Sequence, residues 1–181
     1  MSETKSSPSW NDVKTKLKDF DCAGLLGLVQ GLYAANKDNQ NFLHARFGLG
    51  DDVLKPFKAT IVRWLRPDLF KRHDTSVAKA RKAISDYKKA IGQPEGLAEL
   101  MVFYCEQASG FSNDAGHQDE GYFDALVRMF ERALKIIASL TQAQRLRLWT
   151  RLDTVRRISH NFGYGIGDTL GDLLAEYRDD G

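Results

Sequence analysis

The sequence lacks most features that mark secreted, membrane-spanning or disulfide-bonded proteins. Its two cysteines, Cys22 and Cys105, stand far apart, so neither a disulfide framework nor a zinc site of clustered thiols is indicated. The polar amino terminus lacks the apolar segment of a secretory signal, and no apolar run approaches the roughly 20 residues that cross a bilayer. These absences predict a cytoplasmic protein that makes no membrane contact and keeps both thiols reduced.

Strand signals are equally scarce. The chain shows no clean period-two alternation, and apolar residues recur instead at three- and four-residue spacing behind capping residues such as Asp21 and Ser76. The pattern predicts helices over 10–20, 22–37, 39–47, 52–65, 77–91, 94–109, 122–140, 142–162 and 167–180. We therefore expect an all-α protein of antiparallel helix pairs, either a short helical-repeat array of the HEAT or TPR type or a compact multi-helix bundle. A spacing of about 46 residues between the segments 75–109 and 121–161 matches the period of such an array. No sequence motif repeats with it, so a compact bundle is the competing interpretation.

The predicted domain organisation is simple. A chain of 181 residues suggests one domain or two small ones. We expect flexible ends at 1–9 and 179–181 and a single helical domain over 10–178, with a possible subdivision near 67–75.

Charge is distributed in blocks along the chain. Residues 51–91 carry eleven bases against five acids, residues 92–127 carry seven acids and no base, and residues 128–160 carry eight bases against two acids. Two basic blocks thus flank an acidic one, although the net charge of the whole chain is only +2. This alternation predicts electrostatic matching between neighbouring helices.

The stretch RRISHNFGYGIGD, residues 156–168, is the most unusual in the chain. A helical wheel points Arg156 towards the apolar side of its helix, where a guanidinium requires a partner. We expect that partner in the acidic block, as Glu106 or Asp119, in a structural salt bridge. The alternative is an anion or phosphodiester site formed by Arg156 and His160, with Asn161 beside them.

The glycines of the same stretch match neither a dinucleotide fingerprint nor a P-loop. Gly163 as a helix C-cap and Asp168 as the next N-cap explain the run, and an anion cradle at the following helix N-terminus is the alternative. The polar loop over 106–123 is rich in oxygen ligands but has no recognised metal-binding spacing. The sequence therefore indicates no metal ion or other cofactor.

A basic face is a further candidate site. It comprises Arg63, Arg66, Lys79, Lys82 and Lys89, with Lys71 and Arg72 in the connector between two helices. Trp64 and Tyr87 are expected in the core, so aromatic side chains for base stacking are not interleaved with these bases. A solvated, charge-matched face is favoured, with nucleic-acid binding through blocks 51–91 and 128–160 as the alternative.

Three segments carry a resemblance to a known family: AKARKAISDYKKA, LAELMVFYCEQASGFSNDAGHQDEGYFDALVRMFERALK and GYGIGDTLGDLLAEY. Over most of residues 10–177 the chain resembles a family of small bacterial proteins known only as a domain of unknown function. The resemblance implies a bacterial cytoplasmic protein and supplies no catalytic residue.

The sequence as a whole favours a non-enzymatic helical scaffold or adaptor that binds another protein or itself. Amphipathic helices without a recognised active-site constellation support this interpretation. The alternatives are a nucleic-acid-binding protein, and a phosphate- or metal-dependent hydrolase built around Arg156, His160 and the acidic loop.

Overall fold

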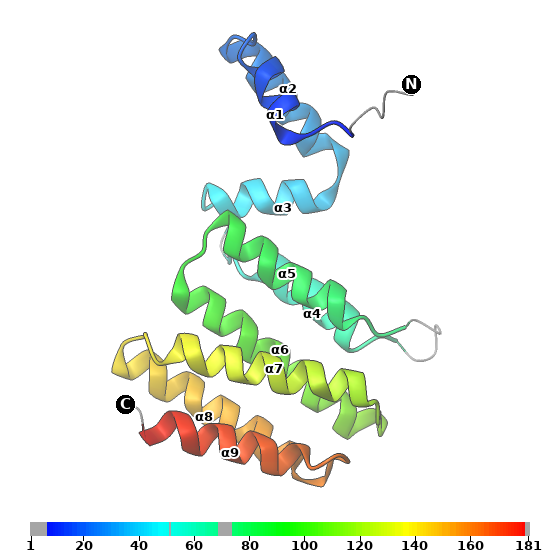
Figure 1. Cartoon of the computed structure of the whole chain (residues 1–181), viewed down its shortest axis with the longest axis vertical. Coiled ribbons are helices and arrows are strands. Elements are labelled where there is room, and N and C mark those ends of the chain that lie inside the picture. Colours follow the sequence, from blue (N-terminus) through cyan, green and yellow to red (C-terminus); the bar gives the residue numbers. More distant parts are fainter. Residues whose placement is uncertain (1–6, 51, 69–73, 180–181) are drawn as a thin grey trace, which may run out of the picture. The chain divides into compact units, whose positions relative to one another are not determined.

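The computed structural model describes residues 7–50, 52–68 and 74–179, and the regular structure within these ranges is entirely helical (Figure 1). The predicted all-α class is confirmed. The chain divides into an N-terminal unit, Met1–Leu43, and a C-terminal unit, His44–Gly181. Residues 69–73, within the predicted subdivision near 67–75, lie outside the described ranges. The same holds for residues 1–6 and 180–181 of the two predicted flexible ends.

The N-terminal unit contains α1 (Trp10–Leu17), α2 (Cys22–Ala35) and most of α3 (Lys37–Arg46). Asp21 caps α2 as predicted, since its Oδ1 accepts a hydrogen bond from the Gly24 N–H at 2.7 Å. Asn36 caps α3, since its side chain accepts from the Asn39 N–H at 2.9 Å, and Asp38 lies in the first turn. None of the described residues up to Leu43 is buried.

In the described part of the C-terminal unit, three helix pairs follow one another along the chain (Figure 1). The pairs are α4 (Lys55–Leu65) with α5 (Val77–Ala90), α6 (Pro94–Ala115) with α7 (Glu120–Ile137), and α8 (Gln142–Ile158) with α9 (Ile166–Asp179). The second helices of the pairs begin at residues 77, 120 and 166. The separation between successive starts agrees with the period of about 40–47 residues found in stacked helix-pair repeats. The sequence-based pairing was shifted by one helix, because it joined α5 with α6 and α7 with α8.

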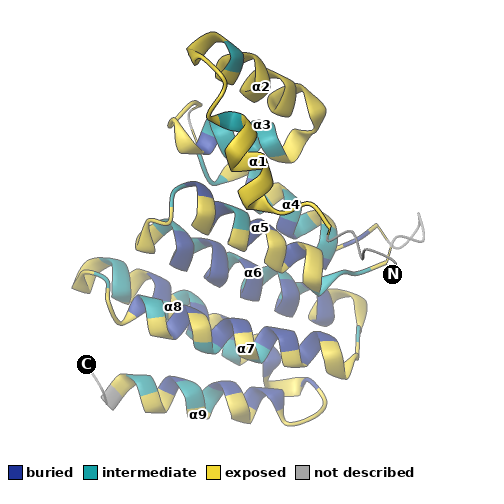
Figure 2. Ribbon diagram, turned by 45° about the horizontal axis from the view of Figure 1, so that its top comes forward, coloured by how far each residue is buried: buried dark blue, intermediate teal, exposed yellow. Residues whose placement is uncertain are grey.

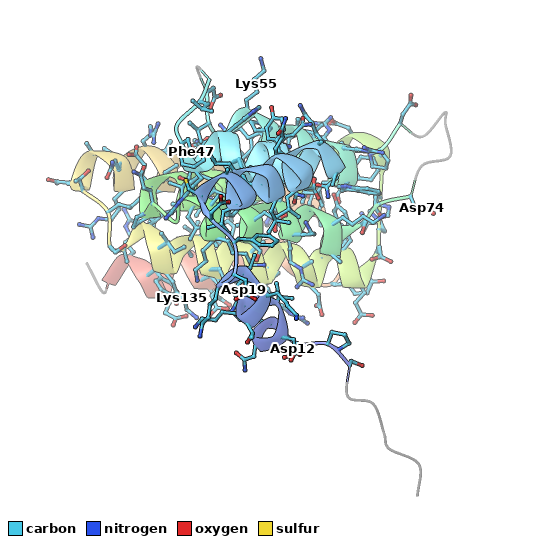
Figure 3. All side chains as sticks on the ribbon, turned by 90° about the horizontal axis from the view of Figure 1, so that it is seen from above. Asp12, Asp19, Phe47, Lys55, Asp74 and Lys135 are labelled. Atoms are coloured by element: carbon cyan, nitrogen blue, oxygen red, sulfur yellow. The ribbon has the colours of Figure 1, made fainter. Side chains whose placement is uncertain are left out.

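The core of the C-terminal unit lies around α6, which packs against α4, α5, α7 and α8. Eleven residues of α6 are buried, among them Leu100, Tyr104 and Cys105. The neighbouring α7 is amphipathic, and its apolar side faces this core, with Phe123, Phe130 and other large side chains buried (Figure 2). Charged side chains such as Lys55 and Lys135 extend away from the helix layers (Figure 3). Because apolar and charged faces are segregated, the helices can bury their apolar surface together, and this burial drives folding of the unit.

Helix α6 is longer than the sequence indicates. Gly110 was expected to end it, but the helix continues to Ala115 and ends at Gly116, whose φ of 63° suits only a left-handed C-cap. At Gly110 a Cβ would lie 3.3 Å from Nη1 of Arg66. Because Gly110 has no side chain, the Arg66 guanidinium can approach α6 closely. There it pairs with Asp114 at 2.6 Å.

Candidate functional site

Arg156 finds its ionic partner on its own helix. Its Nε donates to Oδ1 of Asp153 at 2.9 Å, and the guanidinium of Arg157 lies 3.3 Å from the other oxygen of the same carboxylate. The predicted pairing of Arg156 with Glu106 or Asp119 is therefore wrong. One turn of helix brings Asp153 close enough, so a carboxylate from another helix is not required.

Glu106 is instead bound by Arg151, which lies on α8 five residues before Arg156. Two parallel hydrogen bonds of 2.7 Å join the Arg151 guanidinium to the Glu106 carboxylate. The third nitrogen of Arg151 lies 2.5 Å from Oε2 of Glu99, whose other oxygen accepts from Lys58 Nζ at 2.8 Å. These four residues, the Arg151 network, join α4, α6 and α8 with balanced charge.

The Arg151 network lies at the edge of the core and is only partly accessible to solvent. Burial raises the pKa of Glu99, but hydrogen bonds from Arg151 and Lys58 outweigh burial and hold that pKa below its ordinary value. The pKa of Arg151 is raised, chiefly by its hydrogen bonds to Glu106. Both shifts favour the charged forms, so the network is an ion-pair cluster at neutral pH.

The ion pairs between helices confirm the predicted matching of charge blocks. The acidic block supplies Glu95, Glu99, Glu106 and Asp114, and their partners Lys58, Arg66, Arg147 and Arg151 come from the two flanking basic blocks. The acidic α6 thus lies between basic residues on α4 and α8.

The other residues of the predicted anion site have separate positions. Asp119 caps α7, where its Oδ1 accepts from the Tyr122 N–H at 2.7 Å. His160 and Asn161 are exposed in a short 3₁₀ segment after α8. A Cβ on Gly167 would lie 2.5 Å from the His160 Cα, so the start of α9 packs directly on this backbone. The structure assigns these residues local roles in capping and chain reversal.

A groove of about 510 Å³ does adjoin Arg156, between α8 and α9. Its lining includes Trp149, Asp153, Leu174 and Arg178 beside Arg156. His160, Asn161, Glu106 and Asp119 are not among the lining residues. The constellation expected for a hydrolase is therefore not assembled in this groove.

The glycine-rich turn differs in detail from its prediction. The left-handed residues are Tyr164, with φ of 62°, and Gly165, with φ of 66°, rather than Gly163. Helix α9 begins at Ile166, so Asp168 lies in its first turn and is not its N-cap. The turn reverses the chain between two packed helices, in agreement with the interpretation as a helix stop and restart.

The polar loop expected between the sixth and seventh helices is mostly helical. Only residues 116–119 separate α6 from α7. Across the described ranges, no three His, Cys, Asp or Glu side chains are grouped so that they hold a metal ion.

The basic face is a set of separate local interactions on α4 and α5. Lys79 Nζ lies 3.9 Å from the centre of the Trp64 ring, and the Arg63 guanidinium lies 5.2 Å from it. Trp64 is half-buried beneath these cations, whereas Tyr87 is in the core as predicted. Lys82 pairs with Asp86 on its own helix at 2.6 Å.

The remaining members of the basic face are Arg66, paired with Asp114, and the exposed Lys89. Lys71 and Arg72 lie outside the residues that the structure describes. Nucleic-acid binding by this face remains a prediction.

Helix α2 presents an apolar surface that the described residues of its own unit leave largely exposed. The 14 residues CAGLLGLVQGLYAA contain no charged side chain and no buried residue (Figure 2). Its exposed large side chains are Leu25, Leu26, Leu28, Val29, Leu32 and Tyr33. Sequence reasoning placed this helix correctly but did not detect its exposure, for which the absence of charge was the available signal.

A second feature missed by sequence reasoning is a cavity of about 700 Å³ in the C-terminal unit. Its lining residues come from α3, α4, α5, α6, α8 and the loop after α3, and include Arg46, Lys58, Tyr87, Glu99 and Arg151. They span more than 100 residues of sequence. No local motif reveals such a site.

Comparisons with models of protein families, with curated proteins and with solved structures find no match to this chain. Within the described part of the chain, no helix has the length and apolar character needed to cross a membrane.

Proposed function

We propose that the chain is a non-enzymatic helical adaptor that binds a protein partner through α2, in the cytoplasm of a bacterium. The observation that carries this proposal is the exposure of α2, where Leu26 is 65% and Leu32 52% accessible. An uncharged helix with contiguous large apolar side chains is characteristic of an interaction site.

The energetics of an isolated α2 support the need for a partner. Helices shorter than about 12–15 residues are marginal in water even in favourable sequences. Each interior glycine costs about 1 kcal/mol relative to alanine, and α2 contains Gly24, Gly27 and Gly31. Burial of its leucines against a partner supplies the missing stabilisation, at about 25 cal/mol for each Å² of apolar surface removed from water.

The shape of α2 indicates an apolar groove as the complementary surface. At 100° per residue, one side carries large residues and the opposite side carries small ones. The large side comprises Leu25, Leu26, Val29, Leu32 and Tyr33, and the small side comprises Ala23, Gly27, Gly31 and Ala34. A helix that is apolar all round requires cover on several sides, which a groove provides more fully than a single contact line with a second copy of α2.

A matched pair of substitutions tests this proposal. Leu26 on α2 and Leu146 on α8 are similarly exposed, at 65% and 68%. We expect Leu26→Asp to weaken partner binding about tenfold or more, because it introduces a charge into an apolar interface. Leu146→Asp should leave binding unchanged. The measurement is affinity capture with the full chain, followed by interferometry with each captured protein in purified form.

The proposal fails if no captured protein rebinds after purification, or if both variants bind equally. Light scattering of the full chain provides the second arm. A dimer that forms with increasing concentration and is lost in Leu26→Asp would show that α2 binds a second copy instead of another protein.

A further inference from the structure

The cavity in the C-terminal unit has the size of a small-molecule site and a wall rich in charge. Its volume of about 700 Å³ falls within the range of roughly 300–1,000 Å³ typical of ligand pockets. Four basic residues, Arg46, Lys58, Arg147 and Arg151, line it together with Glu95 and Glu99. The lining therefore carries two more positive than negative charges.

The ion pairs around the cavity leave Arg46 as the uncompensated charge. The Arg151 network is neutral in itself, and Arg147 pairs with Glu95 at 3.2 Å. Arg46 has no carboxylate partner among the described residues, and Nη1 donates to the Ala90 carbonyl at 3.0 Å. This hydrogen bond offsets the negative end of α5 and leaves the other donors of Arg46 available at the cavity.

The hydroxyl of Tyr87 is a second free donor in the cavity wall. The Tyr87 side chain is only 2% exposed, and within the described residues its hydroxyl forms no hydrogen bond. Burial, and then the nearby Glu95 carboxylate, raise the pKa of Tyr87, so the group stays protonated and able to donate. Because Tyr87 lines the cavity, a ligand or water there can accept a hydrogen bond from this hydroxyl.

The N-terminus of α6 opens on the same cavity. Pro94 occupies the first turn, and Gln93 at the N-cap provides no side-chain cap. The first-turn N–H groups of a helix have no intrahelical partners, so those of Glu95 and Gly96 remain for a ligand. Gly96 also makes room for Tyr87, because a Cβ at position 96 would lie 2.0 Å from the Tyr87 Oη.

We propose that this cavity binds a small organic molecule through a phosphate or carboxylate group. The oxyanion accepts hydrogen bonds from Arg46, the Tyr87 hydroxyl and the first turn of α6. The Arg151 network holds the walls in place and is not itself a donor, since all three guanidinium nitrogens are already bonded to carboxylates. The proposal does not depend on α2.

Calorimetric titration of the full chain with inorganic phosphate, glycerol phosphate and succinate tests the site and distinguishes phosphate from carboxylate. We expect Arg46→Gln to weaken binding about tenfold or more and Tyr87→Phe several-fold, as for the loss of a charged and of a neutral hydrogen bond. Arg157→Gln, which removes an exposed arginine of α8, is the matched control and should bind as the parent protein does.

Tyr87→Phe is the decisive variant, because its hydroxyl bonds to no described residue and its removal should not lower the stability of the fold. Retained stability with weaker binding supports the proposal. Absence of binding by all three probes overturns it, as does equal binding by the parent protein and all variants, which would indicate adsorption to surface charge. Binding unaltered in Leu26→Asp separates this result from the function proposed for α2.

Discussion

Helices α2 and α7 show that apolar content alone does not bury a helix. Helix α2 contains no charged residue, yet none of its residues is buried. Helix α7 contains six charged residues among its 18, yet it buries nine others, because the charges occupy one side and the apolar residues the other. Segregation, rather than the amount of apolar surface, therefore determines which helices build the core.

The two units also differ in the ion pairs that join their helices. In the C-terminal unit, α6 supplies carboxylates that bases on α4 and α8 bind. The N-terminal unit has no such framework on α2, which carries no charge at all. The C-terminal unit thus contains ion pairs that join its helices, whereas the function proposed above requires an external surface for α2.

The largest expected difference concerns truncation of one large side chain in each unit. Phe130→Ala should destabilise the protein by about 3–5 kcal/mol, because Phe130 is fully buried in α7 and its loss leaves a cavity. Leu26→Ala should change stability by no more than about 0.5 kcal/mol, since the side chain is already exposed. Urea unfolding followed by circular dichroism measures both, and a comparable loss in the two variants would contradict the distinction between the units.

A smaller effect is expected from the network that joins α4, α6 and α8. Arg151→Met should cost about 1–3 kcal/mol, because it leaves Glu106 unpaired and Glu99 with only Lys58. The control Arg128→Met removes an exposed pair with Asp124 within α7 and should cost less than about 0.5 kcal/mol. If both variants unfold at the same urea concentration, charge matching does not stabilise the C-terminal unit.

Replacement of a glycine by alanine should have opposite effects in the two units. Gly96→Ala should destabilise the C-terminal unit by about 1–2 kcal/mol, because its new methyl group would displace the buried Tyr87 side chain. Gly27→Ala should raise the helicity of the N-terminal unit, because alanine favours a helix by up to about 1 kcal/mol over glycine. Outside the backbone of its own helix and its chain neighbours, no described atom lies within 4 Å of the added methyl group. Thermal unfolding detects the first change and circular dichroism at 222 nm the second. A loss of helicity in Gly27→Ala would show that α2 is closely covered in the free chain.

The smallest expected effect is the pH dependence contributed by Glu99. Its pKa is lower in the folded protein than in the unfolded chain, so its contribution to stability is complete above the unfolded pKa of about 4.3. That contribution should be lost as the pH falls through the lower, folded pKa. Comparison of unfolding free energies between about pH 6 and pH 3 should therefore give a shallower acid dependence for Glu99→Gln than for the parent protein. An identical dependence in both proteins would argue against an ion-paired Glu99.

Periodicity and caps predicted most of the helices, because an amphipathic pattern constrains the helix and its buried face together. The end of α6 was missed because Gly110 is a helix breaker by propensity, whereas here the glycine accommodates a neighbouring arginine. The partner of Arg156 was missed because a helical wheel gives direction but not distance. It points equally to a carboxylate on a facing helix and to Asp153 one turn away.

The candidate sites were harder to predict than the fold. The cavity collects residues from distant segments, and its free donors are identified only once the ion pairs around them are known. Exposure of α2 is likewise a tertiary property. An uncharged apolar helix is expected in a core, whereas in the described part of this chain none of its residues is buried.

Amide hydrogen exchange of the full chain, purified alone, tests most directly whether α2 depends on an external partner while the C-terminal unit does not. We predict that amides of α6 and α7 exchange at least about 1,000-fold more slowly than those of α2, since α2 opens without unfolding the core. Protection of α2 equal to that of α7 in the monomeric chain would contradict the account.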